Sequence, residues 1–264
     1  MAANPPTELR DWLPIRAVNY VCQPEMATNS RPHSTTLTSM QSGAAILLDL
    51  DGTLTDPREG ILGCLRYALE RVGAGIPSDE QLEAFIGPPL HESLAQLIGA
   101  DSVRMTDAIA FYRERFTAKG MFENRVYPGI TRALTEMQES GASLFVATSK
   151  PQPFAEKILE HFDLRKFFRG IYGSDLDGGR SKKSALISHV LESEKLTASS
   201  TAMVGDRAQD IVGAKANDVF AIGALWGYGS RDELMSVGAE VLCDQPSRLS
   251  QTVSFNYPFT PTRA

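Results

Sequence analysis

Cysteine is scarce in this chain of 264 residues. The three cysteines, Cys22, Cys64 and Cys243, lie far apart and form no Cys-x-x-Cys pair or cluster with histidine. Their odd number and wide spacing argue against a disulfide framework and against a zinc site. A chain of this length buries roughly 70–75% of its unfolded surface, so its fold needs no covalent or metal support. We therefore expect three reduced cysteines that mostly pack.

Long apolar runs and an excess of basic residues are also missing. No stretch approaches the roughly 18 apolar residues of a membrane span, so we expect no membrane partner. The N-terminus lacks the basic segment and apolar core of a signal peptide, which predicts a cytoplasmic protein. Lys and Arg number 26 against 32 Asp and Glu, a net charge of −6. This acidity argues against a nucleic-acid partner but allows an anionic small-molecule substrate.

Residues 1–42 differ from the rest of the chain. They hold five prolines and a Ser/Thr-rich stretch, and no helical or strand period persists in them. We expect this N-terminal extension to be disordered. The remainder divides into a core, residues 43–59 and 126–250, an insert, residues 60–125, and a C-terminal tail, residues 251–264.

From Ala44 onward, short continuous apolar runs alternate with helical stretches. Such runs are typical of buried parallel strands, and the alternation predicts an α/β fold with a doubly wound, Rossmann-like parallel sheet. The loops at the carboxyl ends of the strands are then expected to form the site. The expected strands are Ala44–Leu50, Ser143–Ala147, Ala202–Val204, Val219–Leu225 and Ala239–Leu242.

The insert contains no convincing strand and predicts about four helices. It follows the first strand and precedes the second, as a helical cap domain would. The expected helices are Gly60–Val72, Ser78–Phe85, Pro89–Ile98 and Val103–Lys119.

The first strand ends in two acids, Asp49 and Asp51, followed by Gly52. Carboxylates two residues apart just past a strand can face one cavity, where close like charges require a cation or a shared proton. Asp49 then fits a nucleophile and metal ligand, and Asp51 a general acid and base.

Three later segments carry complementary groups. Thr148 follows the second strand, where its hydroxyl can hydrogen-bond a phosphate oxygen. Lys182 and Lys183 open a helix, from which a lysine can reach a phosphate as a point charge. Asp206 and Asp210 are four apart, so a helix beginning there places both on one face, where hard oxygen ligands suit Mg²⁺.

These segments together resemble the four motifs of the haloacid dehalogenase superfamily, and most closely its phosphoglycolate phosphatase-like group. The likeness covers residues 44–245 and includes Phe85–Leu90, Thr148–Pro151 and Leu225–Ser230. It implies that Asp49 forms an aspartyl-phosphate, which Asp51 helps to form and hydrolyse, while Thr148 and a lysine hold the phosphoryl oxygens. We favour Lys183 and keep Lys182 as the alternative. The implied Mg²⁺ ligands are Asp49, the backbone carbonyl of Asp51 and Asp206, with Asp210 either a further ligand or placed just outside them.

The expected reaction is Mg²⁺-dependent hydrolysis of a small phosphorylated metabolite, phosphoglycolate foremost, by a monomer or homodimer. A 5′-nucleotidase is the nearest alternative, and a phosphosugar mutase of the same superfamily is a further one. Thr53, Ser149 and Lys150 beside the phosphate site, and Gly87 and Pro88 in the insert, are the expected substrate-binding residues.

Overall fold

The computed structural model describes residues 43–99 and 102–259. The N-terminal extension 1–42, for which we expect disorder, lies outside the described residues, as do residues 260–264.

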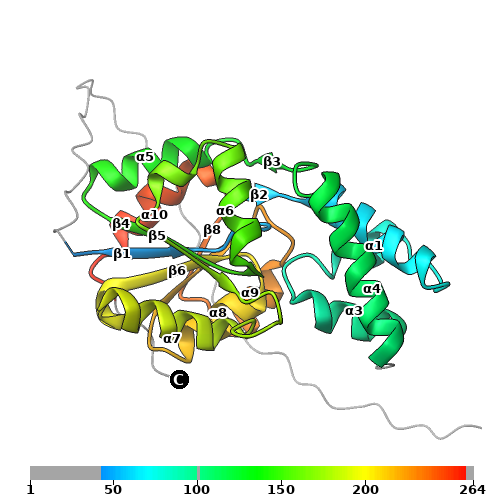
Figure 1. Ribbon diagram of the computed structural model, residues 1–264. Coiled ribbons are helices and arrows are strands. Elements are labelled where there is room, and N and C mark those ends of the chain that lie inside the picture. The colour runs from blue at the N-terminus through cyan, green and yellow to red at the C-terminus, as the bar shows by residue number, and fades with distance from the viewer. Residues whose placement is uncertain (1–42, 100–101, 260–264) are drawn as a thin grey trace, which may run out of the picture. The chain divides into compact units, whose positions relative to one another are not determined.

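Among the described residues, six parallel strands form the main sheet in the order β5-β4-β1-β6-β7-β8 (Figure 1). The apolar run at Ala45–Leu48 becomes the central strand β1, which pairs with β4 and β6 and is buried on both faces. This confirms the predicted doubly wound parallel sheet. The strands are β1 (Ala45–Leu48), β4 (Ser143–Pro151), β5 (Gly170–Ser174), β6 (Thr201–Gly205), β7 (Phe220–Ala224) and β8 (Val241–Cys243).

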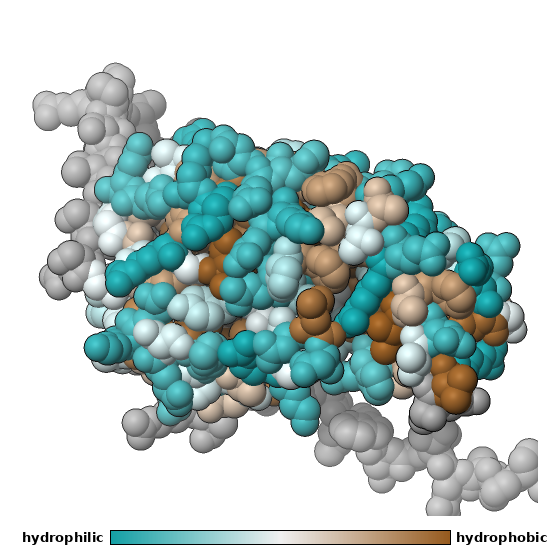
Figure 2. Space-filling view, viewed as in Figure 1, coloured by the Kyte–Doolittle hydropathy of each residue, from teal (hydrophilic) through white to brown (hydrophobic). Residues whose placement is uncertain are grey.

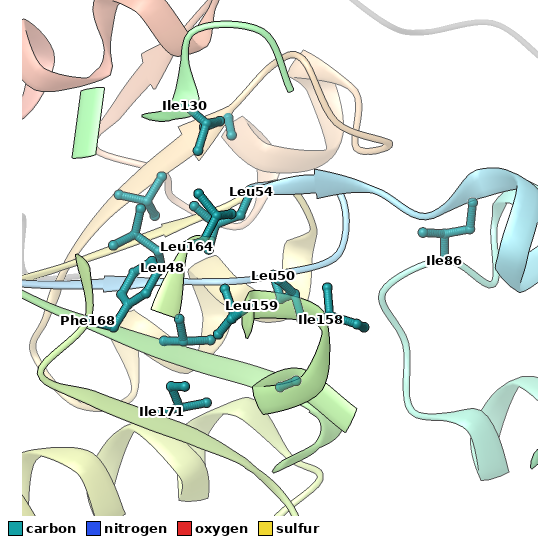
Figure 3. Close-up of a cluster of buried hydrophobic side chains, with 14 of the residues drawn as sticks. Leu48, Leu50, Leu54, Ile86, Ile130, Ile158, Leu159, Leu164, Phe168 and Ile171 are labelled. Carbon is teal, nitrogen blue, oxygen red and sulfur yellow. The ribbon is translucent and has the colours of Figure 1, made fainter. Parts of the chain in front are cut away.

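Helices cover both faces of this sheet (Figure 1). Because successive strand residues point to opposite faces, Ala45 and Leu47 pack on one side, and Ile46 and Leu48 on the other. Figure 3 shows Leu48 gathered with side chains from the helices on its face. One face is covered by α7 (Lys183–Glu194), α8 (Ala208–Lys215) and α9 (Arg231–Ser236), and the other by α5 (Ile130–Glu139), α6 (Gln152–His161) and α10 (Leu249–Phe255). Short 3-10 turns are η2 (Arg165–Phe167), η3 (Ala198–Ser200) and η4 (Pro246–Arg248).

The described fold differs from the sequence-based prediction in three places, two in the sheet and one at the C-terminal helix. Strand β5 was not expected, because its sequence Gly-Ile-Tyr-Gly-Ser lacks a continuous apolar run. Strand β4 runs four residues beyond Ala147, so that it carries the segment expected to form a loop. The boundary placed at residue 250 falls inside α10, which packs against α5.

The insert is helical and joins the core through two short antiparallel strands, β2 (Thr55–Asp56) and β3 (Arg125–Val126). Since β2 leads into the insert and β3 leads out of it, their pairing brings the two connections together. A capping box at Ser78 starts the second helix, with the Gln81 amide 3.4 Å from the Ser78 hydroxyl. The insert, hereafter the cap, consists of α1 (Arg58–Arg71), α2 (Asp79–Glu83), α3 (Leu90–Ile98), α4 (Ser102–Arg115) and a π-helical turn, η1 (Phe116–Gly120).

Figure 2 shows a mainly hydrophilic surface on which hydrophobic residues are scattered among polar ones. Within the described ranges, no helix combines the length and the apolar character that crossing a membrane requires.

Candidate active site

Asp49 and Asp51 lie at the carboxyl end of β1, where the chain turns sharply. The turn closes through the Gly52 amide, which donates to the Thr55 carbonyl at 2.8 Å. Gly52 has a φ of +87°, and a Cβ there would lie 2.2 Å from a carboxylate oxygen of Asp206. Only glycine satisfies both conditions. The turn holds Asp49 at 2% and Asp51 at 7% exposure, so both carboxyls face the protein interior.

Lys183, at the start of α7, is the cation among these acids. Its Nζ lies 2.9 Å from Asp49 Oδ1 and 2.7 Å from Asp210 Oδ1, and donates to the Ala147 carbonyl at 2.9 Å. The two carboxylates raise the pKa of Lys183, although burial acts more strongly in the opposite direction than either alone. Lys182 is exposed just before the helix, so the structure brings Lys183 and not Lys182 to the site.

Asp206 follows β6 and is held by two donors. The Thr53 hydroxyl donates to its Oδ1 at 3.0 Å, and the backbone amide of Tyr228 donates to its Oδ2 at 2.9 Å. Asp206 precedes α8, so a turn rather than the helical period brings it near Asp210. Asp210 accepts the Arg207 amide at 3.0 Å. Thr53, expected to bind substrate, is fully buried with its hydroxyl committed to Asp206.

Asp49, Asp206 and Asp210 form a cluster that suits a divalent cation. Each offers one carboxylate oxygen, and these oxygens lie within 4.8 Å of one another. Burial, followed by repulsion from the other two carboxylates, raises the pKa of Asp206 well above its usual value. Burial also raises the pKa of Asp210 to about 6. Since Lys183 supplies one positive charge to three carboxylates, the cluster favours a hard cation such as Mg²⁺.

The side chain of Asp51 lies outside this cluster and pairs with Lys150. Lys150 Nζ is 2.7 Å from Asp51 Oδ2 and 4.6 Å from the centre of the Phe116 ring in the cap. Asp51 Oδ1 is buried and accepts no hydrogen bond from a described residue. Burial raises the pKa of Asp51 more than Lys150 lowers it. This carboxyl can therefore hold a proton more readily than an ordinary aspartate.

The other predicted site residues fall into two groups. Thr148 is buried next to Ala147, and its hydroxyl oxygen accepts the Lys150 amide at 3.3 Å. Ser149 lines a cavity of about 390 Å³ between cap and core, together with Lys150, Gly87 and Pro88. Asp51 lies at the core end of this cavity, whereas Thr53 does not line it. The cavity therefore leads from the cap to one member of the acidic pair.

Arg207 is a residue that the sequence analysis did not single out. From the core, its guanidinium donates to the cap carbonyls of Ile86 at 2.6 Å and Ala84 at 3.3 Å, and pairs with Glu233 at 3.1 Å. A Cβ on Gly87 would lie 2.9 Å from the Arg207 side chain, and Gly87 has a φ of +101°. The spacing within the motif marks the flanking aspartates, but no sequence signal shows that the arginine between them reaches the cap.

The chain is similar to several known proteins. The chain is 47% identical over 208 residues to a protein named 5′-nucleotidase from Pseudomonas aeruginosa, covering 79% of this chain and 94% of that protein. It is 36% identical over 192 residues to the tyrosine-protein kinase PtkA of Mycobacterium tuberculosis, covering 73% of this chain and 65% of that protein. The crystal structure of a predicted phosphatase from Clostridium acetobutylicum superposes with a TM-score of 0.77 at 40% identity, covering 80% of this chain and 98% of that one.

Residues 46–224 match the family described as haloacid dehalogenase-like hydrolases. The chain belongs to this family and is one of its phosphatases.

Proposed function

We propose that the protein hydrolyses a phosphomonoester through a phosphoryl intermediate on Asp49. The observation that carries this proposal is the pair of buried carboxyls at the end of β1, one beside Lys183 and the other with its pKa raised by burial. Asp49, Asp206, Asp210 and the backbone carbonyl of Asp51 would hold Mg²⁺, which neutralises charge on the phosphoryl group when bound.

The remaining steps are assigned to side chains. A carboxylate oxygen of Asp49 attacks phosphorus, the ester P–O bond breaks, and protonated Asp51 gives its proton to the leaving oxygen. Asp51, now a carboxylate, removes a proton from a water molecule that attacks the phosphoaspartate and releases phosphate. Lys183 and Thr148 hold the phosphoryl oxygens. The three donors of Lys183 Nζ face Asp49, Asp210 and the Ala147 carbonyl in the free protein, so one of them turns to the phosphoryl group when the substrate binds.

For the substrate we propose a nucleoside 5′-monophosphate, ahead of the phosphoglycolate that the sequence favours. A cavity of about 390 Å³ lies within the roughly 300–1,000 Å³ typical of sites for larger ligands, and the two-carbon acid of phosphoglycolate would leave much of it empty. Much of the cap wall is apolar, which suits the flat body of a nucleoside better than a carboxylate. The apolar lining residues are Ile61, Leu65, Phe85, Leu90, Ile109, Phe116 and Phe154.

The substrate proposal is tested by kcat/KM for the purified full chain with Mg²⁺ on a panel of esters. We expect nucleoside 5′-monophosphates to exceed phosphoglycolate by at least about tenfold, a difference of about 1.4 kcal/mol in transition-state binding. A higher kcat/KM for phosphoglycolate than for the nucleotides would contradict the nucleotide proposal and make phosphoglycolate the preferred substrate. Interconversion of sugar phosphates with little release of phosphate would instead favour the phosphosugar mutase.

The metal proposal is tested by a readout independent of turnover. We expect Mg²⁺ to raise the melting temperature of the EDTA-treated protein and EDTA to abolish phosphate release, because a cation relieves repulsion among buried carboxylates. Asp206→Asn should lose the Mg²⁺-dependent shift, whereas Asp244→Asn, at an exposed surface pair, should keep it. An unchanged shift in the Asp206 variant would contradict the assignment.

A further inference from the structure

Three aromatic rings in a row line the cavity, two from the cap and one from the core. Tyr112 of α4 stacks on Phe116 with ring centres 5.7 Å apart and planes 16° from parallel. Phe116 meets Phe154 of the core edge-on, with centres 5.3 Å apart. All three residues line the cavity that holds Asp51. They provide a rigid apolar wall beside the group proposed to protonate the leaving oxygen.

Tyr112 differs from its neighbours because it brings a polar atom into this wall. The residue is only 8% exposed, yet its hydroxyl makes no hydrogen bond to another residue in the described part of the chain. The hydroxyl is not one of the fully buried side-chain atoms that lack a partner in the described chain, so it opens onto the cavity that Tyr112 lines. A tyrosine hydroxyl that opens onto a cavity and bonds no described residue is free to donate to a ligand there.

The surroundings of Tyr112 place it near the reacting end of the cavity. Its pKa is raised well above that of an ordinary tyrosine, first by burial and then by Cys64 and Asp51, whose negative forms oppose ionisation of the phenol. The phenol therefore stays protonated at neutral pH and acts as a hydrogen-bond donor. Asp51 and Tyr112 both line the cavity. Lys150 connects them, because its Nζ lies 2.7 Å from Asp51 Oδ2 and 4.6 Å from the centre of the Phe116 ring, on which Tyr112 stacks.

We propose that Tyr112 determines specificity by donating a hydrogen bond to an oxygen of the leaving group that neighbours the ester bond. This proposal rests on the proposed function and refines its substrate class: phosphate esters of alcohols with a second oxygen close to the phosphate, as in the ribose of a nucleotide. The rings of Tyr112, Phe116 and Phe154 then pack against the apolar body of the leaving group. An ester without that oxygen gains nothing from this hydroxyl.

The test is a kinetic comparison of Tyr112→Phe with the wild-type protein on AMP and on 4-nitrophenyl phosphate, which has no oxygen next to its ester. We expect the variant to lose about tenfold in kcat/KM on AMP and to stay within about twofold on the aryl ester. Its melting temperature should not fall, because the deleted hydroxyl has no partner in the free protein. Tyr67→Phe is the matched control, since Tyr67 is a cap tyrosine whose hydroxyl donates to Glu114 at 2.7 Å, on the exposed surface.

Every outcome decides the proposal. An equal loss on both esters, no loss on AMP, or a melting temperature lowered by several degrees would overturn it. If the wild-type protein does not hydrolyse AMP, the nucleotide assignment fails by itself. The variant is then compared on the aliphatic ester of the panel with the highest kcat/KM, where an unchanged value overturns the role of Tyr112.

Discussion

At the scale of single residues, one lysine organises the acidic site. Lys183 contacts two buried carboxylates and a carbonyl. Its charge therefore offsets part of the repulsion among the carboxylates that we propose bind Mg²⁺. A buried ion pair is not by itself strong evidence of stability, but removing one partner leaves the other charge uncompensated. The lysine is thus expected to support the fold as well as the reaction.

Replacing this lysine should reveal both roles. Lys183→Met is expected to lower the free energy of unfolding by about 3–5 kcal/mol, measured by urea denaturation, and to remove phosphate release. Lys182→Met is the matched control, because Lys182 is exposed one residue earlier, and it should change neither quantity appreciably. Comparable losses in the two variants would contradict the assignment of Lys183.

At the scale of elements, the β2–β3 connection between cap and core is fixed by one buried acid. Asp56 of β2 accepts hydrogen bonds from the Tyr228 hydroxyl and, at 2.9 Å, from Arg125 Nε of β3. Burial raises the pKa of Asp56, but these bonds and one from the Arg58 amide together lower it. Asp56 therefore contributes stability above its unfolded pKa, and this contribution is lost as the pH falls through its folded pKa.

The role of Asp56 in this connection can be tested by measuring how the free energy of unfolding depends on pH. Asp56→Asn should lower the free energy of unfolding by about 1–2 kcal/mol near neutral pH, and its difference from the wild-type protein should shrink as the pH falls below the ordinary pKa of an aspartate. Asp244→Asn, which removes an exposed pair with Arg248, should show no such difference. A difference that is independent of pH would mean that the charge of Asp56 does not hold the two strands.

Elements with a strong pattern could be predicted from the sequence, and weakly patterned ones could not. The spacing of Ile130, Leu134 and Met137 gave α5, and those three side chains are buried as expected. Strand β5 was missed because only Ile171 and Tyr172 give it core contacts, and they stand among glycines and a serine. Two-residue strands such as β2 and β3 carry no period at all, since their pairing depends on contacts far apart in the sequence.

At the scale of the whole described molecule, cap and core meet across the cavity through a few polar contacts. Arg207 donates to the Ala84 and Ile86 carbonyls in the cap loop, the segment between α2 and α3. Arg113 of the cap donates to the Leu176 carbonyl of the core, and Lys150 of the core lies over the Phe116 ring of the cap. The sequence predicted the acids that follow β1 and β6, because these motifs keep their order along the chain. It could not predict Tyr112 or these contacts, since they depend on how the cap packs on the core.

The contact at Arg207 should matter for binding more than for chemistry. Arg207→Lys cannot reproduce both carbonyl bonds together with the Glu233 pair, so the cap loop should be held less firmly. We expect KM to rise about tenfold while kcat stays within about twofold. Arg248→Lys, at a surface pair, should leave both unchanged. A fall in kcat at constant KM would instead place Arg207 in the chemical step.

The most direct test of the central claim is phosphate release by Asp49→Asn at saturating Mg²⁺ on the best ester of the panel. The substitution keeps the shape of the side chain but removes the attacking carboxylate. We predict a loss of at least about a thousandfold in kcat, with a melting temperature within a few degrees of the wild-type protein, because loss of a nucleophile is among the largest single effects on turnover. Phosphate release at more than about a tenth of the wild-type rate, from a folded variant, would contradict the mechanism.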